Sequence, residues 1–165
     1  MKLATIRVVV EPLTPEVAAG RYAIKRVLGE TVTVEADAFA DGHDVLACSV
    51  RFRGPGDAEW RDAPMEPLVN DRWRGSFSVG ELGEYRYTVM GWIDRFGTWE
   101  HQLHKRVEAS QDVRVDLLIG AALVAEAAEH APPDDAEALR GYERELRAGN
   151  HEPAFAPGLA RRMAA

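Results

Sequence analysis

The stretch LACSVRFR, residues 46–53, decides the expected fold class of this chain of 165 residues. Every second side chain in it is apolar: Leu46, Cys48, Val50 and Phe52. The side chains between them are small or polar, and an apolar period of two is typical of a β-strand with one face in a core and the other in water. The stretch therefore predicts a half-buried strand.

The same alternation extends on both sides of this stretch, from residue 6 to residue 94. Further strands are expected at residues 6–10, 32–38, 72–79 and 85–93. Residues that favour turns separate the strands at 40–43, 53–56, 64–67 and 80–83. Short strands with frequent turns predict a mainly β chain whose residues 1–95 form an immunoglobulin-like antiparallel β-sandwich. The expected core contains Val34, Ala36, Leu46, Cys48, Val50, Phe52, Phe77 and Tyr87.

The apolar period changes after residue 95, and residues 96–165 are expected to form an α-helical hairpin segment. Helices are predicted near residues 97–108, 113–130 and 134–148, although a final strand is an alternative for the first of them. Thr98 and Asp134 are the expected N-terminal caps, and Gly149-Asn150 ends the third helix. A further helix begins near Gly158, and its end, GLARRMAA, carries no stop signal. We therefore expect the segment to be truncated inside an element.

The predicted helix at 113–130 is apolar over more than one stripe, whereas a surface helix normally has one. Its apolar residues are Leu117, Leu118, Ala121, Ala122, Val124, Ala125 and Ala128. Two such hairpins meeting about a two-fold axis would bury the extra surface in a four-helix bundle, so we expect a homodimer through the helical segment. The alternative is that the next helix and the sandwich cover this face within one chain.

Composition excludes several classes of protein. With 46% hydrophobic and 28% charged residues the chain is expected to fold as a globular domain. The net charge of −7 argues against a nucleic-acid partner and against an anionic membrane surface. No stretch approaches the roughly 20 apolar residues that cross a bilayer. One cysteine, Cys48, and no secretory leader pattern predict a cytoplasmic protein.

Three motifs suggest chemistry, and each has a plainer interpretation. His101 and His104 are three residues apart and could hold a metal, but a zinc site needs three or four ligands, so solvated side chains are favoured. Residues 41–44, DGHD, look like a catalytic cluster and are better explained as a turn. Four tryptophans offer a sugar-stacking surface, with core or interface positions as the alternative: Trp60, Trp73, Trp92 and Trp99.

Three stretches of the sequence together indicate a family. They are RVVVEPLTPEVAAGRY (residues 7–22), GRYAIKRVLGETVTVEADAFADGHDVL (20–46) and PMEPLVNDRWRGSFSVGELGEYRYTVMGWIDRFGTWEHQLHKRVEASQDV (64–113). The motifs DGHD at 41–44, NDRWRGSF at 70–77 and Thr98-Trp99 lie within them. This part of the chain resembles the N-terminal domain of the bacterial α-1,4-glucan:maltose-1-phosphate maltosyltransferases, which belong to the α-amylase clan. The likeness extends from about residue 6 to residue 128.

The resemblance implies a fragment of an enzyme of glycogen or α-glucan metabolism. The family's retaining chemistry uses carboxylates on a (β/α)₈ barrel of about 250 residues, which this chain is too short to contain. We therefore expect the chain to be inactive alone, to have no catalytic, cofactor-binding or metal-binding residue, and to end before the catalytic barrel of the same polypeptide. Its implied role is structural, with homodimer contacts and with α-glucan bound only through the full enzyme. Candidate interface or sugar-contact residues are Trp92, Trp99 and Leu118.

Two other classes of function remain open at this point. One is a free-standing α-glucan-binding module that uses exposed tryptophans. The other, a small metalloenzyme that uses His101 and His104, has less support because no further ligand is apparent.

Overall fold

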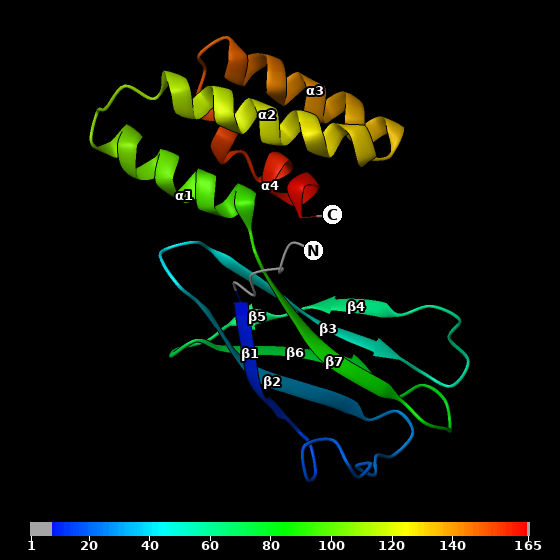
Figure 1. The fold of residues 1–165 in the computed structure, drawn as a ribbon. Helices are drawn as coiled ribbons and strands as arrows, with labels where there is room; N and C mark the ends of the chain where they lie inside the picture. The colour runs from blue at the N-terminus through cyan, green and yellow to red at the C-terminus, as the bar shows by residue number, and fades with distance from the viewer. Residues whose placement is uncertain (1–7, 165) are drawn as a thin grey trace, which may run out of the picture. The chain divides into compact units, whose positions relative to one another are not determined.

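The computed structural model describes residues 8–164 and divides into two compact units, Met1–Ile93 and Asp94–Ala165 (Figure 1). The first unit contains all the strands of the described residues, and the second contains the helices. Ile6, the first residue of the expected first strand, lies outside the described residues.

The strands of the first unit form two antiparallel sheets, visible as separate layers in Figure 1. One sheet has the order β1 (Val8–Thr14), β2 (Thr31–Ala40), β6 (Arg72–Ser78) and β5 (Glu66–Pro67). The other has the order β4 (Arg61–Pro64), β3 (Leu46–Arg53) and β7 (Arg86–Ile93). Several pairs of consecutive strands lie in different sheets, so the chain crosses repeatedly between the two layers.

The core of the first unit lies between the two sheets. The predicted register is confirmed, because Val34, Ala36, Cys48, Val50, Phe52 and Phe77 are all buried. Leu46 and Tyr87, also expected in the core, are half-buried and pack against it. Phe52 of β3 stacks on Phe77 of β6 with ring centroids 4.6 Å apart, which joins the two layers at one end.

The expected turn at residues 64–67 is wrong. In the structure this segment passes from one sheet to the other: β4 pairs with β3, and β5 pairs with β6. Met65 lies between them, is buried, and donates its backbone N–H to the carbonyl of Cys48 at 2.9 Å. The two prolines mark the crossing because neither can donate a ladder hydrogen bond.

Helices make up the second unit. They are α1 (Arg95–Glu108), α2 (Arg114–His130), α3 (Pro133–Arg147), the 3₁₀ turn η1 (Glu152–Phe155) and α4 (Pro157–Met163). Since these helices occupy as much of the described chain as the strands do, "mainly β" is too narrow a description of the fold. No helix of the described residues is long and apolar enough to cross a membrane.

The expected helix caps were wrong at two places. Asp94, not Thr98, caps α1, and its Oδ1 accepts the N–H of Gly97 at 2.8 Å. Asp134 lies in the first turn of α3 rather than at its cap, because Pro133 occupies the first helical position, where its missing N–H costs nothing. Gly149, at φ 90°, follows the end of α3, as the Gly149-Asn150 signal predicts.

The core of the helical unit consists of leucines and small residues around one tryptophan. Trp99 of α1 is buried, lies 5.4 Å from the ring of Phe96, and donates its indole N–H to the carbonyl of Asp116 at 2.7 Å. α2 comes close to this ring at Gly120, where an added Cβ would lie 1.9 Å from Trp99 Cζ2. The glycine therefore allows α1 and α2 to pack directly over the indole.

Candidate binding site at one end of the sandwich

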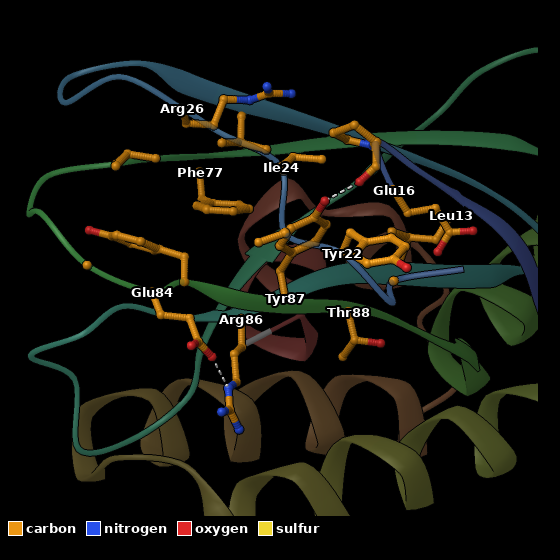
Figure 2. Close-up of a pocket in the computed structure, with 17 residues that line it drawn as sticks. Leu13, Glu16, Tyr22, Ile24, Arg26, Phe77, Glu84, Arg86, Tyr87 and Thr88 are labelled. Carbon is orange, nitrogen blue, oxygen red and sulfur yellow. Dashed lines mark hydrogen bonds and ion pairs between the residues drawn. The ribbon is translucent and has the colours of Figure 1, made fainter. Parts of the chain in front are cut away.

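A cavity of about 690 Å³ lies in the first unit, between the segment that joins β1 to β2 and the strands β6 and β7 (Figure 2). Its apolar lining includes Val32, Phe77 and Val79, which also belong to the sandwich core. Figure 2 shows Tyr22, Tyr87 and Phe77 around the same cavity, one from the joining segment and one from each strand. We call this cavity the tyrosine pocket; its three tyrosines are Tyr22, Tyr85 and Tyr87.

Two of the tyrosines are anchored through their hydroxyls. Tyr87 donates to the carbonyl oxygen of Pro15, and this bond ties the joining segment to β7. Burial raises the pKa of Tyr87, which keeps its hydroxyl protonated and able to donate. The hydroxyl of Tyr85 accepts the backbone N–H groups of Gly80 and Glu81, both at 3.1 Å. Both rings are thus held in place before any ligand arrives.

Tyr22 comes from the segment that joins β1 to β2 and is 59% exposed. It follows a tight turn in which Ala18, Ala19 and Gly20 have φ values of 51°, 54° and 75°. Successive residues in the left-handed region are costly when they carry a Cβ. The turn is closed by the backbone N–H of Tyr22, which donates to the carbonyl of Val17 at 3.3 Å, so the fold uses a strained turn to place this ring at the pocket.

The two arginines that line the pocket are each paired with a carboxylate. Arg86 pairs with Glu84, with 2.8 Å between Nε and Oε1. Arg26 pairs with Glu30, with 3.4 Å between Nε and Oε1. Glu16 and Thr88 complete the polar lining named in Figure 2. Both lining arginines already have a carboxylate partner, so the pocket is less suited to an anionic ligand than one with an unpaired cation.

The tryptophans do not form one surface. Trp73 and Trp99 are buried, in the sandwich core and in the helical core respectively. Trp60 is 38% exposed and lies beside the guanidinium of Arg53, whereas Trp92 is 44% exposed on β7 opposite Ala47. Arg53 and Ala47 are six positions apart on β3, so the two exposed rings lie about 20 Å apart along the strand direction.

Leu118 lies on an exposed face of α2 and is 51% exposed. The neighbours of Leu118 on that face are also apolar: Val115, Ile119 and Ala122. These four residues, which we call the α2 stripe, follow the helical spacing of three and four. The opposite face of α2 is buried in the unit's core through Leu117, Ala121, Val124 and Ala128, so the helix is apolar on two faces.

The histidine motif lies on the helix α1, and the DGHD motif lies in the bend between β2 and β3. His101 and His104 are both exposed on α1, and His104 Nδ1 lies 3.4 Å from Glu108 Oε2. Within residues 8–164 no group of three or more His, Cys, Asp or Glu side chains could hold a metal ion. Residues 41–44 form the bend between β2 and β3, with Gly42 at φ 97°, as the turn interpretation predicts.

The sequence pattern did not reveal the tyrosine pocket. The strand expected at residues 85–93 places Tyr87 on its core face, and Tyr87 packs at the core in the structure, but this gives no hint of a cavity. The pocket forms because residues 15–26 fold over the end of that face, and no period in the sequence determines where such a segment lies. The available signal was Tyr22 directly after the Gly20 turn, an aromatic residue in a loop.

Comparison with known proteins identifies what the chain is similar to. Residues 6–165 match a family described as α-1,4-glucan:maltose-1-phosphate maltosyltransferase, domain N/S. A maltosyltransferase of that name from Chlorobaculum tepidum is 43% identical over 154 residues, covering 93% of this chain and 23% of the relative. One from Myxococcus xanthus is 46% identical over 140 residues, covering 80% of this chain and 21% of the relative. The resemblance found in the sequence is confirmed, and the chain spans less than a quarter of these relatives' length.

Proposed function

This chain belongs to the family of domain N/S of the α-1,4-glucan:maltose-1-phosphate maltosyltransferases, and from that premise we propose that it is the non-catalytic N-terminal region of such an enzyme. The observation that carries the proposal is the match of residues 6–165 to a domain that is only part of the relatives. The relatives' name describes a maltosyl transfer between maltose 1-phosphate and α-1,4-glucan. We assign that reaction to the rest of the polypeptide.

The architecture supports a structural role. In this clan the reaction needs paired carboxylates on a parallel (β/α)₈ barrel. Every strand pairing described here is antiparallel, and the helices follow the strands instead of alternating with them. The sandwich is best placed in the immunoglobulin-like group, since one four-stranded and one three-stranded antiparallel sheet enclose its core. Cys48, the chain's one cysteine, is buried and free, which supports a cytoplasmic location.

The direct test is release of inorganic phosphate. Incubated with maltose 1-phosphate and a maltooligosaccharide, the chain is expected to release no phosphate above a protein-free control. A full-length relative under the same conditions is the positive control. Phosphate release that depends on this chain would contradict the proposal.

We also assign homodimer contacts to the helical unit, and the α2 stripe supports this. Val115, Leu118 and Ile119 are 68%, 51% and 51% exposed, although each is a large apolar residue. A second copy related by a two-fold axis would cover the stripe with the same stripe.

Sedimentation equilibrium tests this assignment. Leu118→Glu should raise the dimer dissociation constant by about a hundredfold, since each dimer carries the buried charge twice. Leu82→Glu is the matched control, because Leu82 is 85% exposed in a loop of the other unit and should leave the mass unchanged. A wild-type chain that stays monomeric, or a Leu82→Glu effect equal to that of Leu118→Glu, would remove the dimer assignment.

The alternative of a free-standing module that binds α-glucan through exposed tryptophans has less support. Two of the four tryptophans are buried, and the exposed pair is too widely separated to stack on neighbouring sugar rings.

A further inference from the structure

We propose that the tyrosine pocket is a binding site for a short segment of α-1,4-glucan. The proposal rests on the proposed function, because the family's glucan substrate supplies the chemical class. It differs from the expectation that α-glucan is bound only through the full enzyme, since this unit would contact the glucan directly.

The size and enclosure of the pocket suit an oligosaccharide. Its volume of about 690 Å³ falls within the roughly 300–1,000 Å³ of small-molecule sites. The lining comes from the joining segment, from β1, β2, β6 and β7, and from the loop between β6 and β7, and it forms a concavity. An α-1,4-glucan curves along its length and fits a concave wall, whereas a β-1,4-glucan is straight and needs a flat aromatic platform.

The side chains match a neutral sugar. A glucosyl ring has apolar C–H faces that pack on aromatic rings and a periphery of hydroxyls that both donate and accept hydrogen bonds. The tyrosine rings of the pocket can pack on the C–H faces of the sugar. The carboxylates of Glu16 and Glu84 can accept hydrogen bonds from its hydroxyls, and the guanidinium of Arg26 can donate to them. Arg26 and Arg86 are already paired with Glu30 and Glu84, so a sugar phosphate gains little from the site.

The pocket is also preformed. Tyr85 and Tyr87 are fixed by hydrogen bonds to backbone atoms, and Tyr22 is placed by the strained turn at residues 18–20. Rigid aromatic side chains lose little conformational entropy on binding. Tyr22 is 59% exposed, although the Arg21 guanidinium lies over its ring at 5.7 Å from the centroid, and it is therefore the residue on which binding should depend most.

Isothermal titration calorimetry and saturation-transfer NMR of the 165-residue chain with maltoheptaose test the proposal. Tyr22→Ala should weaken binding by about tenfold, the loss expected for one stacked ring, and Tyr22→Phe should keep binding within about threefold. Trp92→Ala is the control for the tryptophan surface and should bind like wild type. Because Tyr22 is largely exposed, the far-ultraviolet circular dichroism of the variants should match that of wild type.

Three results would overturn the proposal. They are no binding of maltoheptaose by the wild-type chain, equal binding of cellohexaose, and binding that survives Tyr22→Ala but is lost in Trp92→Ala. None of these affects phosphate release or sedimentation, so failure of the glucan site is distinguishable from failure of the proposed function.

Discussion

The two units of the chain differ in where they leave apolar surface exposed. In the sandwich unit the exposed large apolar residues include loop residues such as Val27 and Leu82, and four aromatic rings line one pocket. In the helical unit they lie in a row along α2, at Val115, Leu118 and Ile119. A pocket suits a small ligand, whereas a stripe on a rigid helix suits another helix. The difference supports assigning ligand binding to one unit and assembly to the other.

The units also build their cores differently. Alternate residues of the strands fill the sandwich, and ion pairs cover part of the outer face of one sheet, where Arg72 lies between Glu35 and Asp37 at 3.2 and 2.9 Å. The hydrogen bond from Arg74 is the largest cause of the lowered pKa of Glu35. The helical core instead depends on small residues that let helices approach closely, as at Gly120. Added volume at Gly120 should therefore be costly.

The largest effect expected from this comparison concerns two tryptophans. Trp99→Ala removes a buried ring and its hydrogen bond to Asp116, so it should lower the unfolding free energy of the helical unit by about 3–5 kcal/mol. Trp92→Ala, at a ring that is 44% exposed on β7, should cost less than about 1.5 kcal/mol. Urea unfolding followed at 222 nm measures the helical unit, and the same unfolding followed by near-ultraviolet circular dichroism, to which the aromatic rings of the sandwich contribute, measures the sandwich. An equal cost for both variants would contradict the different roles of the two rings.

Glycines allow a second test of close packing. Gly120→Ala places a Cβ within 1.9 Å of Trp99 Cζ2 and should destabilise the helical unit by about 1–3 kcal/mol. Gly141→Ala, in the middle of α3 with nothing within 4 Å of the added Cβ, should stabilise it by about 0.5–1 kcal/mol through helix propensity. Thermal unfolding of both variants gives the sign of each change in the stability of the helical unit. Stabilisation by both substitutions would show that helix propensity, and not the contact with Trp99, sets the outcome.

The sequence predicted the sandwich core well because burial on a strand follows a period of two, which LACSVRFR displays directly. The predictions from the sequence are wrong where a residue type has two common structural roles. Thr98 and Asp134 are both good caps, but Asp94 and the pair Pro132-Pro133 determine where the helices begin. The prolines at 64–67 looked like a turn, whereas they mark a change of sheet. The tyrosine pocket depends on how residues 15–26 lie over the sheet end, which no local pattern specifies.

The smallest effect that we expect is a pH dependence of the unfolding free energy that differs between the two units. The sandwich core contains a thiol, and the helical core contains none among the described residues. Cys48 is buried and 3% exposed. Burial raises the pKa of its thiol to about 11. The folded state therefore keeps this proton to a higher pH than the unfolded chain does.

Between the ordinary thiol pKa of 9.0 and the folded value of about 11, unfolding releases a proton from Cys48. The unfolding free energy of the sandwich should accordingly fall as pH rises, by about 1 kcal/mol per pH unit, with the contribution fully present below pH 9. Tyrosines and lysines also titrate there, so Cys48→Ala is the necessary control: it lowers stability at every pH but should lack this part of the slope. Urea midpoints measured from pH 8 upwards give the difference in pH dependence between wild type and Cys48→Ala. Parallel curves for wild type and Cys48→Ala would mean that the thiol ionises equally easily in both states.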